Sequence, residues 1–197
     1  MLAQNLKVAP RQTNASRVIP YVENNNSRAN ITIFSNFGPT PTNLYNVVSG
    51  GYYVSGPLAI DNPTDQWIAI SFTNKVADHA TQIQAAIGYT SGTKKVILGL
   101  YTDNAGAVGT LLAQASTTRI PNTATCCQVA QVNITPTALS AATQYWIVAS
   151  TDDVAAPDFE GIFQPSNSAN IGGDVAQGGW FTFNGLVPAA AVKGTNP

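Results

Sequence analysis

The clearest structural signal in this chain is the octapeptide TQIQAAIG at residues 81–88. Apolar and intervening residues take turns along it: Ile83, Ala85 and Ile87 alternate with Gln82, Gln84 and Ala86. Successive side chains of a β-strand point to opposite faces of a sheet, so this alternation predicts a half-buried strand.

Short runs of similar character recur on both sides of this octapeptide. We expect strands at residues 31–34, 66–73, 81–88, 95–101, 110–117, 128–134, 144–150, 159–163 and 180–183. The segments between them are rich in Asn, Asp, Gly and Pro, which favour turns, and Asp103-Asn104-Ala105-Gly106 is predicted to form a tight turn. Many short strands at this spacing predict one all-β domain over residues 29–197, a jelly-roll-like antiparallel β-sandwich. Residues 66–72 and 95–101 are apolar on both faces, which indicates central strands.

Residues 1–28 are predicted to form an irregular, extended N-terminal arm. Pro10 and Pro20 interrupt this segment, and its apolar residues follow no sustained period. A segment with so little local structure becomes ordered when something holds it in place. We therefore expect the arm to contact other copies of the chain or other subunits of an assembly. The arm also lacks the apolar core of a signal peptide, so either a signal was removed or Met1 is the native start and export takes another route.

The composition favours β structure and a surface that carries little charge. Charged residues make up 10% of the 197 residues, against about 25% in a typical soluble protein. Only Glu23 and Glu160 are glutamates, whereas long helices need such residues on their solvent-facing side. The net charge is −1 and no basic run occurs, so we expect no nucleic-acid partner. No apolar stretch approaches the roughly 20 residues that span a bilayer, so we expect no membrane span.

Few residues are suited to catalysis or to tight metal binding. His79 is the single histidine, no G-x-S-x-G motif accompanies it, and we expect it in the turn before a strand. The acidic residues near position 155 are interpreted as a solvated turn, with a glycosidase pair or a calcium site as alternatives. We predict no enzyme and no cofactor. A weak calcium site stays open at the following residues: Asp103, Asp152, Asp153 and Asp158.

Aromatic residues supply the candidate ligand-binding site. Tyr52, Tyr53 and Trp180 are flanked by glycine, which suits exposed loops. An exposed flat ring can stack on the apolar face of a sugar while amides and hydroxyls bind its polar groups. Trp67 and Trp146 lie inside apolar runs, so we expect them to pack in the core.

From about Ile31 onward the chain resembles the choice-of-anchor R domain, a bacterial extracellular family. The segments that carry this resemblance are Ser35-Asn36-Phe37-Gly38, Tyr45-Asn46, Thr81-Gln82-Ile83-Gln84, Gly88-Tyr89-Thr90-Ser91-Gly92-Thr93, Leu100-Tyr101-Thr102-Asp103-Asn104-Ala105-Gly106, Gly109-Thr110-Leu111-Leu112, Cys126-Cys127 and Gln144-Tyr145-Trp146-Ile147-Val148. The resemblance implies a jelly-roll-like sandwich displayed outside the cell, and it implies no defined activity.

These observations favour a non-enzymatic exterior structural or adhesion protein. We expect it to be a subunit of a larger assembly such as a phage virion, as a decoration or tail component, and to bind glycans. One alternative is a secreted carbohydrate-binding module of a bacterial cell surface, and another is a polysaccharide-degrading enzyme. The expected location is therefore extracellular, on a virion exterior or a bacterial surface.

Cys126 and Cys127 are the only cysteines, and they are adjacent in the sequence. Adjacent Cα atoms lie about 3.8 Å apart across a trans peptide, below the roughly 4.4–6.8 Å of an ordinary disulfide. A bond between the two closes a strained eight-membered ring. It is nevertheless expected in an oxidising exterior, because the chain offers no other partner. Two reduced thiols and an intermolecular bridge are the alternatives.

Intact mass under non-reducing conditions tests this vicinal disulfide. We expect a deficit of about two hydrogens per chain relative to the reduced protein. Two titratable thiols in freshly isolated, unreduced protein would contradict the prediction, and a dimer that dissociates on reduction would indicate the intermolecular bridge.

Overall fold

The computed structural model describes most of the chain beyond the N-terminal arm. The described residues are 30–37, 51–60, 65–123, 125, 128–151, 160–163, 173–176, 180–183 and 187–197. They contain strands and turns and no helix, so no helix among them could cross a membrane. The predicted arm, residues 1–28, lies outside the described residues. The protein is all-β, as the sequence pattern predicts.

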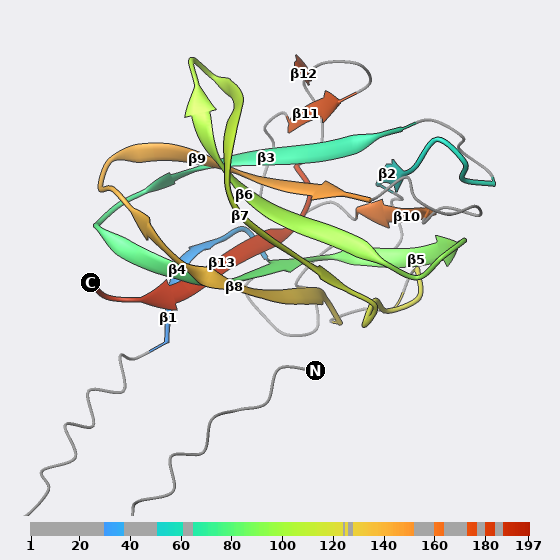
Figure 1. The fold of residues 1–197 in the computed structure, drawn as a ribbon, viewed down its shortest axis with the longest axis horizontal. Coiled ribbons are helices and arrows are strands. Elements are labelled where there is room, and N and C mark those ends of the chain that lie inside the picture. Colours follow the sequence, from blue (N-terminus) through green and yellow to red (C-terminus); the bar gives the residue numbers. More distant parts are fainter. Residues whose placement is uncertain are drawn as a thin grey trace, which may run out of the picture.

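The strands form two antiparallel layers that pack face to face (Figure 1). One layer is the four-stranded sheet in the order β1 (Ile31–Ser35), β13 (Ala190–Thr195), β4 (Asp78–Ala85) and β8 (Ala130–Leu139). The other is the six-stranded sheet in the order β12 (Trp180–Phe183), β11 (Gly173–Ala176), β3 (Trp67–Asn74), β9 (Thr143–Ser150), β6 (Val96–Asn104) and β7 (Ala107–Thr117). A three-stranded sheet has the order β2 (Tyr52–Ser55), β10 (Glu160–Phe163) and β5 (Ile87–Ser91).

The strand order is that of a jelly roll. Eight strands make up the sandwich proper: β1, β3, β4, β6, β7, β8, β9 and β13. Numbered among themselves, they lie in the orders first–eighth–third–sixth in one sheet and second–seventh–fourth–fifth in the other. Each sheet therefore mixes strands from both ends of the chain, as two interlocked Greek keys require. The prediction of a jelly-roll-like sandwich is confirmed.

The core lies between the two sheets and is built by the inward faces of their strands. Ile83, Ala85 and Ile87 are fully buried there and Gln82 and Gln84 are half-buried, which confirms the alternation up to Ala85. Ala86 departs from the pattern, because it is buried as well. Aromatic rings extend the core toward β1: the Phe34 and Phe72 rings stack with centroids 5.0 Å apart, and Tyr145 lies 5.9 Å from Phe72. Because the core takes alternate residues, the remaining residues of each strand face outward.

Several elements differ from their sequence-based prediction. The predicted strand 81–88 is divided between β4 and β5 at Ala86, whose amide donates to the Ala189 carbonyl at 2.9 Å. His79 lies within β4 and not in a preceding turn, because β4 begins at Asp78. Strands β2, β11 and β13 were not predicted. The reason is clearest for β13, whose AAVKGT sequence is rich in residues with low β-propensity.

A glycine in β13 offers a test of the pairing between β13 and β4. A Cβ added at Gly194 would overlap the His79 carbonyl oxygen and lie 2.6 Å from Ile33 Cδ1. Since the backbone of a paired strand cannot easily move aside, we expect Gly194→Ala to lower the free energy of unfolding by about 1–3 kcal/mol. Gly106→Asn is the control. Gly106 has a φ of 90° and no atom within 4 Å of an added Cβ, and Asn tolerates this backbone region. Urea denaturation that finds both variants equally stable would contradict the prediction.

Candidate functional site

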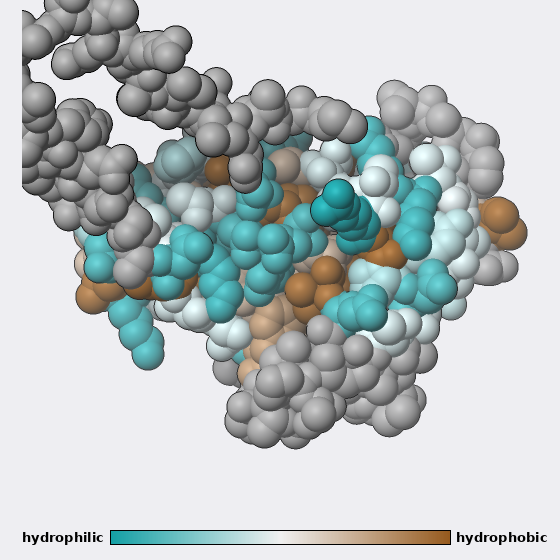
Figure 2. All heavy atoms as spheres, turned by 90° about the horizontal axis from the view of Figure 1, so that it is seen from below, coloured by the Kyte–Doolittle hydropathy of each residue, from teal (hydrophilic) through white to brown (hydrophobic). Residues whose placement is uncertain are grey.

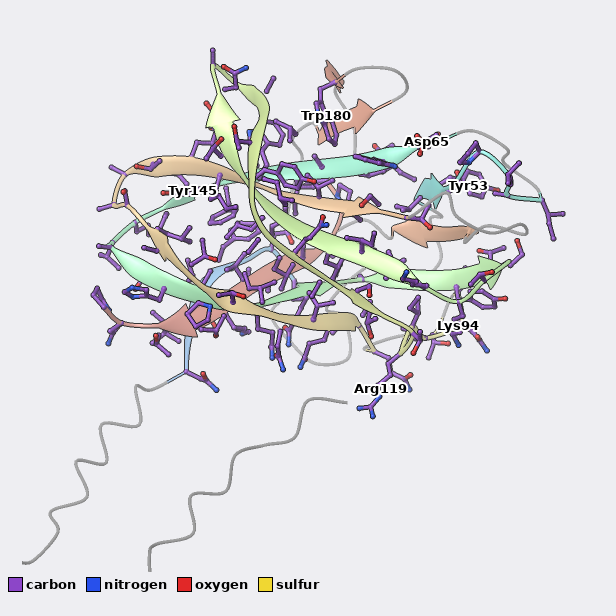
Figure 3. The ribbon with its side chains drawn as sticks, viewed as in Figure 1. Tyr53, Asp65, Lys94, Arg119, Tyr145 and Trp180 are labelled. Atoms are coloured by element: carbon purple, nitrogen blue, oxygen red, sulfur yellow. The ribbon has the colours of Figure 1, made fainter. Side chains whose placement is uncertain are left out.

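The three aromatic residues proposed to bind a ligand lie in two separate parts of the molecule. Tyr52 and Tyr53 begin β2 and Trp180 begins β12, so all three are in strands and not in exposed loops. Figure 3 shows Trp180 on the upper side of the molecule and Tyr53 near one end of the sandwich. Tyr53 is 40% exposed, whereas Tyr52 and Trp180 are half-buried and pack against apolar clusters. These residues therefore do not form one flat platform.

The tryptophans instead gather on the outer face of the six-stranded sheet. Trp67, Trp146 and Trp180, all three tryptophans of the chain, belong to one cluster there. The cluster also contains the following residues: Ala69, Tyr101, Val108 and Val148. Trp67 and Trp146 are thus packed, as expected, but outside the core between the sheets. Trp146 is only 3% exposed, so this cluster acts as a second, smaller core.

Asp103 anchors this cluster to the β6–β7 hairpin. Its Oδ1 accepts hydrogen bonds from Trp146 Nε1 at 2.8 Å and from Gln144 Nε2 at 2.7 Å. Its Oδ2 accepts one from the Gly106 amide at 3.1 Å. Ala105 and Gly106 both have positive φ, as a two-residue type I′ hairpin requires. The expectation of a tight turn at residues 103–106 is confirmed.

These contacts also decide the ionisation of Asp103. Partial burial raises the pKa of this carboxyl, but hydrogen bonds from the Trp146 indole, the Gly106 amide and the Gln144 side chain lower it by more. The pKa of Asp103 therefore lies below its ordinary value. A carboxylate with three protein donors serves the fold, and the weak calcium site at Asp103 stays a prediction.

Most of the other predicted site residues lie outside the residues that the structure describes. Asp152, Asp153 and Asp158 lie outside the described residues, as do Cys126 and Cys127. Among the described residues, no three His, Cys, Asp or Glu side chains are grouped closely enough to hold a metal ion. His79 is half-buried in β4, and its Nδ1 has no hydrogen-bond partner there.

An extended array of polar side chains lies on the outer face of the four-stranded sheet. Strand pairing aligns one row in the order Thr32, Lys193, Gln82 and Asn133, from β1 through β13 and β4 to β8. It aligns a second row in the order Ser35, Ala191, Gln84 and Gln131. At about 4.8 Å between strands, each row spans roughly 14 Å. We call these two rows the amide face, and Figure 2 shows hydrophilic side chains gathered over this side of the molecule.

Hydrogen bonds between side chains lock the amides in place. Gln84 Nε2 donates to Gln131 Oε1 at 2.9 Å and to Gln82 Oε1 at 3.1 Å. Gln82 Nε2 in turn donates to Asn133 Oδ1 at 3.1 Å. The four amides therefore form one chain that crosses both rows. Each of them still has hydrogen-bonding capacity that these bonds do not use, because an amide group has two N–H donors and two acceptor lone pairs.

Shallow hollows lie at both ends of the amide face. One is lined by Asn30, Ile31, Thr32, Thr81, Gln82 and Lys193. The other is lined by Thr117, Arg119, Val129, Gln131 and Asn133, and it adjoins a third hollow that shares Arg119 and Val129 with it. The Gln82–Asn133 hydrogen bond connects the linings of the first two hollows. The amide face thus has depressions at both ends and a hydrogen-bonded chain of amides between them, whereas Ala191 in its second row is buried.

Sequence reasoning missed this face although it had part of the signal. Gln82 and Gln84 were recognised as the solvent-facing side of a strand, and Gln131 and Asn133 show the same spacing of two in β8. A repeated amide at alternate positions is the pattern that could have revealed one row. The alignment of four strands into two rows is not a local property of any of them.

Comparison with known proteins leaves the family open. No protein-family model matches this chain, and a search of curated proteins finds no match. The resemblance to the choice-of-anchor R domain therefore stays an expectation.

Replacing Asp103 tests its role as the anchor of the tryptophan cluster. Asp103→Asn replaces a carboxylate oxygen with an N–H₂ group that faces the donors of Trp146, Gln144 and Gly106. The remaining amide oxygen is also a weaker acceptor for the buried Trp146 indole. We therefore expect this variant to lower the free energy of unfolding by about 1–3 kcal/mol at pH 7. Asp65→Asn makes the same change of charge at an exposed residue and serves as the control, with a smaller expected effect.

The pH dependence of stability has a defined sign in this comparison. A carboxyl with a lowered pKa in the folded state stabilises the fold above its unfolded pKa, near 3.9, and loses that contribution as the pH falls through the folded value. The difference in the free energy of unfolding between the wild type and Asp103→Asn should therefore become smaller below about pH 4. Urea unfolding curves at pH 7 and pH 3 measure it, and an unchanged difference would count against the anchor.

Proposed function

We propose that this protein is a non-enzymatic exterior adhesion and structural protein that binds glycans on its amide face. In this proposal the jelly roll is a rigid support, and the N-terminal arm joins the domain to other copies or other subunits of a larger assembly such as a virion. The location, on a virion exterior or a bacterial surface, is part of the same proposal.

The observation that carries the proposal is the hydrogen-bonded chain of Gln131, Gln84, Gln82 and Asn133. Sugar hydroxyls both donate and accept hydrogen bonds, and carboxamides offer both kinds of group on one planar unit. Because the amides restrain one another, less rotamer freedom is lost when a ligand binds. The rows are also long enough to receive several sugar units of an extended chain.

A secreted bacterial carbohydrate-binding module would use the same face in the same way. The two proposals differ in what the domain is attached to, and whether the native protein occurs in a larger particle separates them. A polysaccharide-degrading enzyme is not supported by any arrangement of the described residues.

Binding to a glycan array, followed by titration of the best ligand, tests the proposal. We expect the double variant Gln82→Ala/Gln84→Ala to weaken binding about tenfold or more, since two hydrogen-bonding groups of about 1 kcal/mol each are lost. Gln114→Ala is the matched control, because Gln114 is exposed on the opposite outer face, paired with Gly99 in the six-stranded sheet.

Thermal melts of each variant establish that any loss of binding is not a loss of fold. No binding to any glycan would overturn the proposal. An equal loss with Gln114→Ala would move the site away from the amide face.

A further inference from the structure

We infer that the glycan recognised by the amide face is acidic, and that one of its anionic groups sits in the hollow beside Arg119. The hollow is lined by Thr117, Arg119, Val129, Gln131 and Asn133. This inference rests on the proposed function and adds the chemical class of the ligand.

The direction of the hydrogen-bond chain leaves donors in this hollow. Gln131 Oε1 and Asn133 Oδ1 both accept from the neighbouring amides of β4. Each of these oxygens therefore already accepts one hydrogen bond, whereas both N–H donors of each amide have no acceptor among the described residues. The two amides that line the hollow consequently offer it hydrogen-bond donors. Such a surface complements a group that only accepts hydrogen bonds, as an ionised carboxylate or sulfate does.

The charges around the hollow have the same sign. Arg119 lines it, and Lys94 lines the adjoining hollow that shares Arg119. Lys94 Nζ lies 5.0 Å from the centroid of the Tyr89 ring, a cation–π contact that restrains the ammonium group. Figure 3 shows Arg119 projecting from the lower side of the molecule, with Lys94 on the same side. Among the described residues, no carboxylate lines either hollow and no ion pair neutralises Arg119.

A third cation stands at the opposite end of the amide face. Lys193 lines the hollow at β1 and donates from Nζ to Thr32 Oγ1 at 2.6 Å. The neutral amides Gln82 and Asn133 lie between Lys193 and the Arg119 hollow, in the row that strand pairing aligns. Across its width the face therefore has a cation at each end and neutral amides between them. This spacing of positive charges suits a polymer that carries an acidic group on each repeating unit.

The exposure of these cations favours a polymer over a small ligand. Arg119 and Lys94 are exposed, so each contact with an anion is weakened by solvent and salt. A single sugar acid gains little from one such contact. A polysaccharide that engages both ends of the face gains through effective concentration, because the second contact becomes intramolecular. Arg119 adds geometric selectivity, because a guanidinium binds planar carboxylates with two parallel hydrogen bonds.

Binding of the full chain to matched pairs of polymers tests the inference. The pairs are polygalacturonate with its methyl-esterified form, and dextran sulfate with dextran. The members of each pair share one sugar backbone and differ in whether it carries anionic groups, and the two pairs distinguish carboxylate from sulfate. We expect at least one acidic polymer to bind about tenfold or more tightly than its neutral partner at 0.15 M salt.

The matched variants are Arg119→Gln, Arg119→Lys and Lys75→Gln. We expect Arg119→Gln to reduce affinity for the acidic polymer about fivefold to tenfold and to leave binding of the neutral partner unchanged. Arg119→Lys should restore part of the loss, because it keeps the charge and loses the paired geometry. Lys75→Gln removes an exposed cation in the β3–β4 connection and should have no effect.

Four results would overturn the inference. One is equal affinity for the acidic and neutral members of both pairs. If that binding is still lost in Gln82→Ala/Gln84→Ala, the ligand is a neutral glycan and the proposed function stands. A second is an equal loss of affinity with Lys75→Gln. A third is equally tight binding of a DNA duplex. Either of these indicates general attraction of polyanions. Absence of binding to these polymers and to every glycan on the array removes the inference and the proposed function together.

Discussion

Burial of Ile83 and Ala85 against the facing sheet holds β4 in a single register, and the outer surface follows from that register. A strand has a side-chain period of two, so a slip of β4 by one residue would move Gln82 and Gln84 into the core and Ile83 to the surface. Neither exchange is tolerable, since buried amides without partners are costly. The position of the amide face is therefore a consequence of the hydrophobic core beneath it.

The two outer faces of the sandwich solve different problems. On the six-stranded sheet, the tryptophan cluster excludes water, and Asp103 supplies the acceptor that its buried indole needs. On the four-stranded sheet the side chains satisfy one another through amide hydrogen bonds and stay accessible. The first arrangement adds stability at the β6–β7 hairpin, whereas the second leaves hydrogen-bonding capacity for a ligand. This contrast is the physical basis for placing binding on the amide face.

Local sequence patterns predicted strands and turns that depend on neighbouring residues. They did not predict which residues of distant strands lie beside one another. The alternation in residues 81–88 and the turn at residues 103–106 were predicted because each depends on neighbours in sequence. Strand β13 was missed because its alanines and glycine carry little β-propensity of their own. It lies between β1 and β4 in the four-stranded sheet, where partners on both sides define it as a strand. The aromatic candidates Tyr53 and Trp180 looked alike beside glycine, yet they lie in different sheets.

The sequence by itself determined the class of this protein: an all-β sandwich with little surface charge, whose strand faces are recorded in a period of two. It indicated buried side chains such as Ile83 and Ala85, because burial follows the hydrophobicity of alternate positions along one strand. Only the tertiary structure decided which strands are neighbours. Lys193 and Thr32 are separated by 161 positions, and Gln82 and Asn133 by 51, yet strand pairing sets all four in one row. The physical reason is that strand pairing in a jelly roll joins segments that are distant in the sequence. No single stretch of the chain therefore contains all the residues of one row across the sheet.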